Sequence, residues 1–118
     1  MPKRVFFRLF PSLEHQIQSN ADKWFPLIID SHPDAREVRA IWYNNLFRGG
    51  TRDEVRVTNL GGGASALLDP ESTGALTIFA FCCRDGEDAE SCRVWVCRNE
   101  VEEELVERET GPVEPGRW

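Results

Sequence analysis

The chain is divided into short β-favouring runs, each ended by glycine, proline, asparagine or an acidic loop. No long helical stretch alternates with them, which excludes the strand–helix alternation of a parallel sheet. We expect strands at residues 24–29, 38–43, 52–58, 75–83 and 92–98. The last two flank an acidic loop and should pair antiparallel, while Pro26 predicts that the first run is an edge strand or carries a bulge. The pattern therefore predicts an all-β, mostly antiparallel barrel or sandwich.

Two short helices are expected beside these strands. Pro2 can occupy the first position of a helix, where its missing N–H costs nothing, and Pro11 ends that segment. The apolar residues between them share one helical face, although their aromatic content also fits a strand. Asp69 is placed to cap one further helical turn. Residues 100–118 are acidic and predict a helical turn with a tail or linker.

Length and charge limit the class of protein. The chain fits one domain over residues 1–118, because two domains would each have too little core. It has no run of about 18 apolar residues and no apolar leader after Met1, so we expect a soluble, cytoplasmic protein without a membrane partner. The net charge of −6 divides unevenly, since residues 1–60 hold 9 Lys/Arg against 7 Asp/Glu and residues 61–118 hold 5 against 13. The basic residues can therefore form a face of their own, as an acidic partner such as DNA requires.

Four cysteines raise the question of a disulfide or a zinc site. Cys82, Cys83, Cys92 and Cys97 include no CxxC pair, and the two histidines lie far away in the sequence. The adjacent Cys82 and Cys83 would point to opposite faces of a strand, which suits a four-ligand cage poorly. We expect reduced, mostly buried thiols that pack as small apolar side chains, with no metal and no cofactor.

Motifs of enzymatic sites are scarce. The sequence has no Walker loop, GxSxG elbow or HExxH pair, and the glycines at 61–63 lack the Gly-Lys-Ser/Thr of a phosphate loop. Asp53 and Glu54 are adjacent and would face opposite sides of a strand, so they make a poor carboxylate pair. His32 stands before Pro33 in a polar turn, where a solvated histidine is expected. We therefore expect no catalytic residue.

Residues 44–59 carry a charged pattern with glycines beside it, between two expected strands. Arg52, Glu54 and Arg56 alternate along the chain, so a strand would place the three side chains on one face, and Arg48 precedes them. One interpretation is a long, solvated hairpin. The other is a projecting arm whose guanidinium groups contact DNA, because a two-stranded ribbon fits the major groove.

Several blocks of the chain, in order, resemble one known family. They are RAIWYN (39–44), TRDEVRVT (51–58), LDPESTGALT (68–77), VWVC (94–97) and EPG (114–116). From about Pro2 to Gly116 the chain is similar to the N-terminal effector domain of EcoRII-type restriction endonucleases. The third block is the most specific of the five.

The resemblance implies a DNA-binding pseudobarrel of about seven strands with short helices, similar to the plant B-three domain, that grips the major groove between two arms. It implies the target CCWGG, where W is A or T, and no chemistry in the domain itself. The implied partners are double-stranded DNA and a C-terminal nuclease domain of the same protein. Residues 44–59 match the C-terminal arm, and the N-terminal arm would precede Met1. Two alternatives stay open: a regulatory protein-interaction domain that docks the nuclease domain without binding DNA, and a small hydrolase or nuclease.

The resemblance also implies roles for individual residues. The base-reading positions fall on Arg52, Glu54 and Arg56. Two arm positions that carry lysine in the family are Gly50 and Val55 here, so part of the phosphate-contacting charge is missing. The positions that contact the DNA backbone or support the arm fall on Arg48, which can compensate for that loss, and on Asn45, Thr51, Asn59, Arg39, Lys3 and Arg4.

Overall fold

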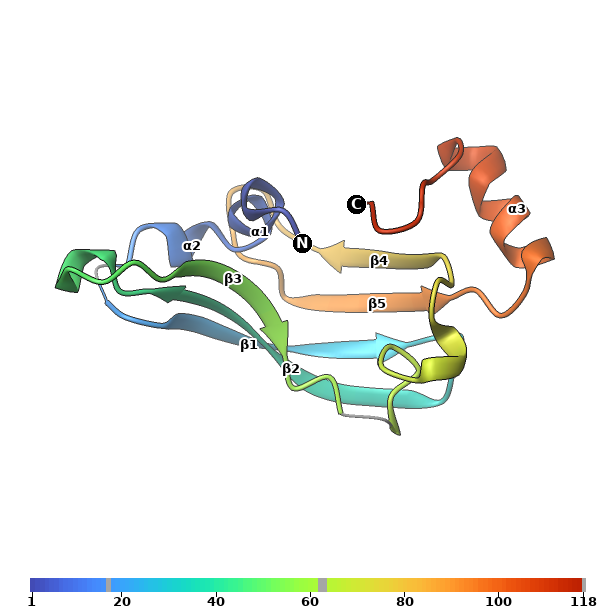
Figure 1. Cartoon of the computed structure of the whole chain (residues 1–118), viewed down its shortest axis with the longest axis horizontal. Coiled ribbons are helices and arrows are strands. Elements are labelled where there is room, and N and C mark those ends of the chain that lie inside the picture. The colour runs from blue at the N-terminus through green and yellow to red at the C-terminus, as the bar shows by residue number, and fades with distance from the viewer. Residues whose placement is uncertain (17, 62–63, 118) are drawn as a thin grey trace.

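The computed structural model describes residues 1–16, 18–61 and 64–117. In chain order its elements are α1 (Lys3–Leu9), α2 (Pro11–Glu14), β1 (Ala21–Ile29), β2 (Asp34–Asn44), η1 (Leu46–Arg48), β3 (Asp53–Thr58), η3 (Pro70–Ser72), β4 (Thr77–Cys82), β5 (Ser91–Val96) and α3 (Glu100–Thr110), where η marks a 3-10 helix. The strands form a curled sheet, with α1 and α2 beside it near one end and α3 near the other (Figure 1). The helices of the described residues are all too short or too polar to cross a lipid bilayer.

The sheet has the strand order β3-β2-β1-β5-β4. All neighbours pair antiparallel except β1 and β5, which pair parallel over Leu27–Ile29 and Cys92–Val94. The predicted all-β class with a mixed, mostly antiparallel sheet is confirmed, and so is the pairing of the last two runs. Each run that predicted a strand forms one, because alternate residues give one face to the core and the other to solvent.

The expected count of seven strands is wrong, because the described residues form five. Between β3 and β4 the described residues, 59–61 and 64–76, form turns and short 3-10 segments that include η3, and no further strand. Asp69 caps η3 as predicted: its carboxylate accepts a hydrogen bond from the Glu71 N–H at 3.0 Å. A segment that holds four glycines and Pro70 favours turns over a continued ladder.

The acidic C-terminal segment forms the eleven-residue helix α3, which is longer than the single turn expected. The Asn99 side chain caps α3 by accepting from the Glu102 N–H at 3.0 Å. Three glutamates in the first turn stabilise the helix, because their negative charges lie at the positive end of the helix dipole. Gly111, with φ of +83°, ends the helix. These local signals, all present in the sequence, extend the expected helical turn into a longer helix.

Pro26 lies in a central strand, and its interpretation as a sign of an edge strand is wrong. β1 pairs with β2 along its whole length, with Pro26 opposite Glu37, but it pairs with β5 only from Leu27 onward. At Pro26 the strand therefore has a paired neighbour on one side only. The missing N–H of proline removes no bond to β5 there, because the second neighbour joins one residue later.

The core is centred on phenylalanines that join the first helices to the sheet. The N-terminal segment is helical, with Pro2 as the residue before α1, and Phe6 and Phe10 are fully buried. The Phe10 ring centroid lies 5.2 Å from that of Phe25 on β1 and 6.2 Å from that of Phe81 on β4. Leu13 of α2 is also fully buried. Phe10 thus bridges strands from both halves of the sheet.

All four cysteines are free thiols, and only two of them meet the expectation of burial. Cys92 and Cys97 are buried, and burial raises the pKa of the Cys92 thiol to about 12. Cys82 and Cys83 are exposed. Strand parity explains Cys82, because its neighbour Phe81 packs on the core and Cys82 must then face outward, whereas Cys83 lies beyond the end of β4. Among the described residues, no group of three or more potential ligands is placed to hold a metal ion.

Candidate nucleic-acid interface

The hairpin between β2 and β3 lies at one end of the molecule, away from α3 (Figure 1). Asn45 closes its loop, since the Asn45 N–H donates to the Arg52 carbonyl (3.1 Å) and the Asn45 side-chain oxygen accepts from the Arg52 N–H (2.8 Å). The Asn45 carbonyl accepts from the Gly50 N–H at 3.0 Å. Gly49 has a φ of +79°, which lets the chain reverse after η1. Asn45 therefore holds the loop in shape, and the Asn44 side chain adds a bond from the Leu46 N–H at 2.9 Å.

The three predicted base-reading residues form what we call the arginine ladder, Arg52–Glu54–Arg56, which begins at the residue before β3 and continues along one face of that strand. Both Nε and Nη2 of Arg52 donate to Oε1 of Glu54, at 2.9 and 2.6 Å, and Nη2 of Arg56 donates to Oε2 at 3.2 Å. The three side chains keep 50%, 39% and 57% of their surface exposed, in that order. Since β3 is an edge strand, the ladder is open to a partner.

Tyr43 of β2 lies opposite Glu54 in the strand register, and its ring lies beneath the two guanidinium groups of the arginine ladder. The guanidinium carbon of Arg52 lies 3.9 Å from the Tyr43 ring centroid, and that of Arg56 lies 5.9 Å from it. The hydrogen bonds from Arg52, with the charge of Arg56, lower the pKa of Glu54 below its ordinary value. The Glu54 carboxylate therefore carries its negative charge at neutral pH.

The opposite side of β3 is fixed to the body of the protein. The Asp53 carboxylate contacts the Lys3 ammonium and accepts a hydrogen bond from Nε1 of Trp42 at 2.7 Å. These two contacts, that of Lys3 first, lower the pKa of Asp53. Lys3, which was expected to contact the DNA backbone, thus joins α1 to β3 in the free protein. Because side chains alternate along a strand, β3 has one side attached to the body of the protein and one side open to solvent.

The other predicted support residues are spread over several elements. Arg39 of β2 forms an ion pair with Asp22, and its guanidinium carbon lies 5.9 Å from the Trp24 ring centroid. Asn59 follows β3 with a φ of +65°, and its amide donates to a backbone carbonyl of β2 at 2.9 Å. The remaining two, both exposed, are Thr51 and Arg4.

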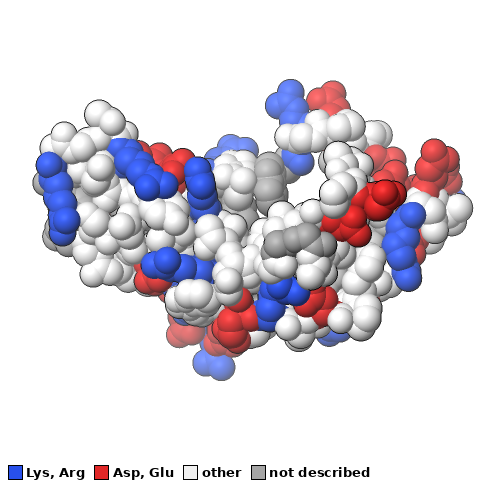
Figure 2. All heavy atoms as spheres, turned by 60° about the horizontal axis from the view of Figure 1, so that its bottom comes forward, with Lys and Arg blue, Asp and Glu red and all other residues white. Residues whose placement is uncertain are grey.

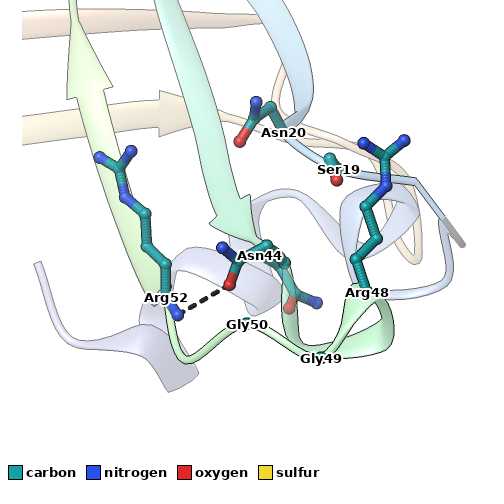
Figure 3. A pocket seen from close by; sticks show the side chains of 8 residues that line it. Ser19, Asn20, Asn44, Arg48, Gly49, Gly50 and Arg52 are labelled. Carbon is teal, nitrogen blue, oxygen red and sulfur yellow. Dashed lines mark hydrogen bonds between the residues drawn. The ribbon is translucent and has the colours of Figure 1, made fainter.

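An open, polar pocket of about 480 Å³ lies at the hairpin loop. Its lining comes from two separate segments, the turn before β1 and the loop between β2 and β3. Figure 3 shows Arg48 and Arg52 extending from the loop in the same direction on either side of Asn44, with Ser19 and Asn20 from the other segment. The structure therefore brings three predicted residues, Arg48, Asn45 and Arg52, together with two that the sequence did not single out.

Charge is distributed along the molecule as the split between the two halves of the chain predicts. Lys and Arg lie over the hairpin end in Figure 2, and Asp and Glu gather more densely toward the α3 end. The seven glutamates of residues 100–114 account for much of that acidic end. The acidic net charge is thus carried largely away from the arginine ladder.

These features define a small β-rich domain whose candidate site is an exposed, arginine-bearing hairpin. The chain belongs to the family of EcoRII N-terminal domains, since the family model described as "Restriction endonuclease EcoRII, N-terminal" matches residues 1–118. The type II restriction enzyme EcoRII of Escherichia coli is 36% identical over 119 residues, which cover 98% of this chain and 29% of that enzyme. The chain thus spans less than a third of the length of this relative.

Sequence reasoning missed Tyr43, Ser19 and Asn20 as neighbours of the predicted residues. Tyr43 could have been found by counting the hairpin register outward from the turn, because residues paired across two strands share a face. Ser19 and Asn20 carried no such signal, since only the folded chain brings the turn before β1 to the hairpin loop.

Proposed function

We propose that this chain binds double-stranded DNA in the major groove of a CCWGG-type site and is the non-catalytic effector domain of a restriction endonuclease. The nuclease domain lies elsewhere in the same protein. The observation that carries the proposal is the arginine ladder, open on an edge strand with Tyr43 beneath it. Membership of the EcoRII N-terminal family supports the effector role.

The chemistry of the arginine ladder suits G·C base pairs. Successive residues on one face of a strand lie about 6.5–7 Å apart, so three of them can reach adjacent base pairs in one groove. Arginine donates to O6 and N7 of guanine, and glutamate accepts from the N4 amino group of cytosine. Each half of CCWGG offers two G·C pairs to such a face.

The internal hydrogen bonds of the arginine ladder leave capacity for these contacts. A guanidinium has five N–H donors, and Arg52 uses two nitrogens on Glu54 while Arg56 uses one. A carboxylate has about four acceptor sites, so Glu54 can hold both arginines and accept a further bond. The free protein therefore presents the three side chains already oriented, which lowers the ordering cost of binding.

A fluorescence-anisotropy titration with a CCWGG duplex and a scrambled duplex tests this proposal. We expect tighter binding to the cognate duplex, and a slope of log K against log[salt] of about −4 to −5 if four to six phosphates are neutralised. A slope near zero, or equal affinity for the two duplexes, would contradict sequence-specific DNA binding.

The second candidate function is a protein-interaction domain that docks the nuclease domain without binding DNA. Helix α3 favours it, because Val101 and Leu105 lie one turn apart on this acidic helix with 66% and 53% of their surfaces exposed. The same titration separates the two candidates, since a docking domain of this kind gives no DNA signal at low salt.

A further inference from the structure

The pocket at the hairpin loop has the composition of an anion site on a chain that is acidic as a whole. Two arginines, Arg48 and Arg52, line it, and no carboxylate is among its described lining residues. The hydroxyl of Ser19 and the carboxamide of Asn20 add neutral hydrogen-bonding groups. The net charge of the chain is −6, so a pocket lined by two arginines and by no described carboxylate differs from the average surface, although Glu54 pairs with Arg52 from outside the pocket.

We infer that this pocket seats one phosphodiester group of the DNA backbone, with Ser19 and Asn20 as phosphate contacts. The inference rests on the proposed function and extends it to a segment outside the hairpin. A volume of about 480 Å³ is large enough for a phosphodiester with part of its sugars and ordered water. Side-chain amides, hydroxyls and arginines are the groups that hold phosphates in protein–DNA interfaces.

The position of the pocket agrees with this role. Arg52 belongs to both features, since it lines the pocket and its guanidinium bonds Glu54 in the arginine ladder. A phosphate in the pocket would therefore lie beside the first base-reading side chain. Phosphate contacts fix the register of a protein on the duplex, and base contacts then read the sequence. The pocket would set where along the groove the ladder begins.

The backbone at Asn20 allows a substitution that changes charge and little else. Asn20 has a φ of +58°, a conformation that asparagine and aspartate both adopt more readily than other side chains. Asn20→Asp therefore keeps the shape and the backbone while it places a carboxylate in the pocket. Asn99→Asp is the matched control, because it adds the same charge at the cap of α3, where aspartate is also a good cap.

We expect Asn20→Asp to weaken binding about five- to tenfold on cognate and scrambled duplexes alike, as one like-charge contact near solvent implies. Asn99→Asp should leave both affinities within about twofold of the parent chain. Equal effects of the two variants would overturn the inference, because only the overall charge would then matter. Thermal unfolding of both variants confirms that each is folded at the temperature of the titration.

Neutral phosphates provide the second measurement. A cognate duplex carrying a single methylphosphonate is titrated at each backbone position in turn, with the parent chain and with Arg48→Ala. At one position the neutral phosphate should lower the affinity of the parent chain but should not lower the affinity of Arg48→Ala any further. The slope of log K against log[salt] for Arg48→Ala should also be smaller by about one. If the parent chain discriminates the cognate duplex but no position shows this coupling, the phosphate seat is wrong and the proposed function stands. If it does not discriminate, the proposed function itself fails.

Discussion

Arg52→Ala and Arg56→Ala are each expected to weaken binding to a CCWGG duplex by about 1–3 kcal/mol, and to affect a scrambled duplex much less. On the cognate site the substitution removes two directed hydrogen bonds from the guanidinium to guanine, whereas on a scrambled site it removes only the charge of the side chain. Anisotropy titrations of the two variants on both duplexes measure the difference. Arg93→Ala is the control, because Arg93 of β5 is also exposed and forms a similar surface ion pair, with Asp30 just after β1.

Glu54→Ala distinguishes a base-reading ladder from an ordinary ladder of surface ion pairs. The substitution removes a negative charge, so electrostatics alone predicts tighter binding to any duplex. Base reading predicts weaker binding to the cognate duplex, because the acceptor for cytosine N4 is lost and both arginines lose their shared partner. Should Glu54→Ala bind cognate and scrambled DNA equally more tightly, Glu54 does not read a base and the assignment of the ladder fails.

Phe10→Ala should have the largest effect on folding, with a loss of about 3–5 kcal/mol in the free energy of unfolding. Phe10 is fully buried and touches both Phe25 and Phe81, so its removal leaves a cavity between two strands and the first helices. Against a total stability of about 5–15 kcal/mol, such a loss is severe.

Urea unfolding followed by tryptophan fluorescence measures this effect. Val101→Ala is the control, since Val101 lies exposed on α3 and should change the free energy of unfolding by no more than about 0.5 kcal/mol. A loss below about 1 kcal/mol for Phe10→Ala would mean that the helices and the sheet do not share one core.

The strands could be predicted from sequence because each has a strong alternating pattern, but their limits and partners could not. β1 begins at Ala21, three residues before the predicted run. Asp22 and Lys23 are charged, so composition alone assigns them to a loop, yet both pair with residues of β2. The central place of Pro26 depends on where β5 joins β1, which is a long-range contact. Local patterns carry no information on such a contact.

The candidate site shows the same division between local and long-range information. The shared face of Arg52, Glu54 and Arg56 follows from strand parity, so the sequence could predict it. The absence of lysine at position 50 has a physical basis that only the fold reveals. A Cβ on Gly50 would lie 2.2 Å from Cγ of Asn45, so any larger residue must displace the side chain that closes the loop.

The short parallel contact between β1 and β5 also has a consequence for the order in which the chain folds. Leu27 and Cys92 are 65 positions apart, whereas β1, β2 and β3 are successive neighbours joined by short turns. Loop closure over so many residues is slow, so the three-stranded meander should form before β5 docks on it. Pulse-labelled hydrogen exchange would show this as protection of β2 amides ahead of the Asp30 amide, which bonds Val94, and simultaneous protection would contradict it. The arginine-bearing hairpin would then be complete while the acidic half of the chain is still unfolded.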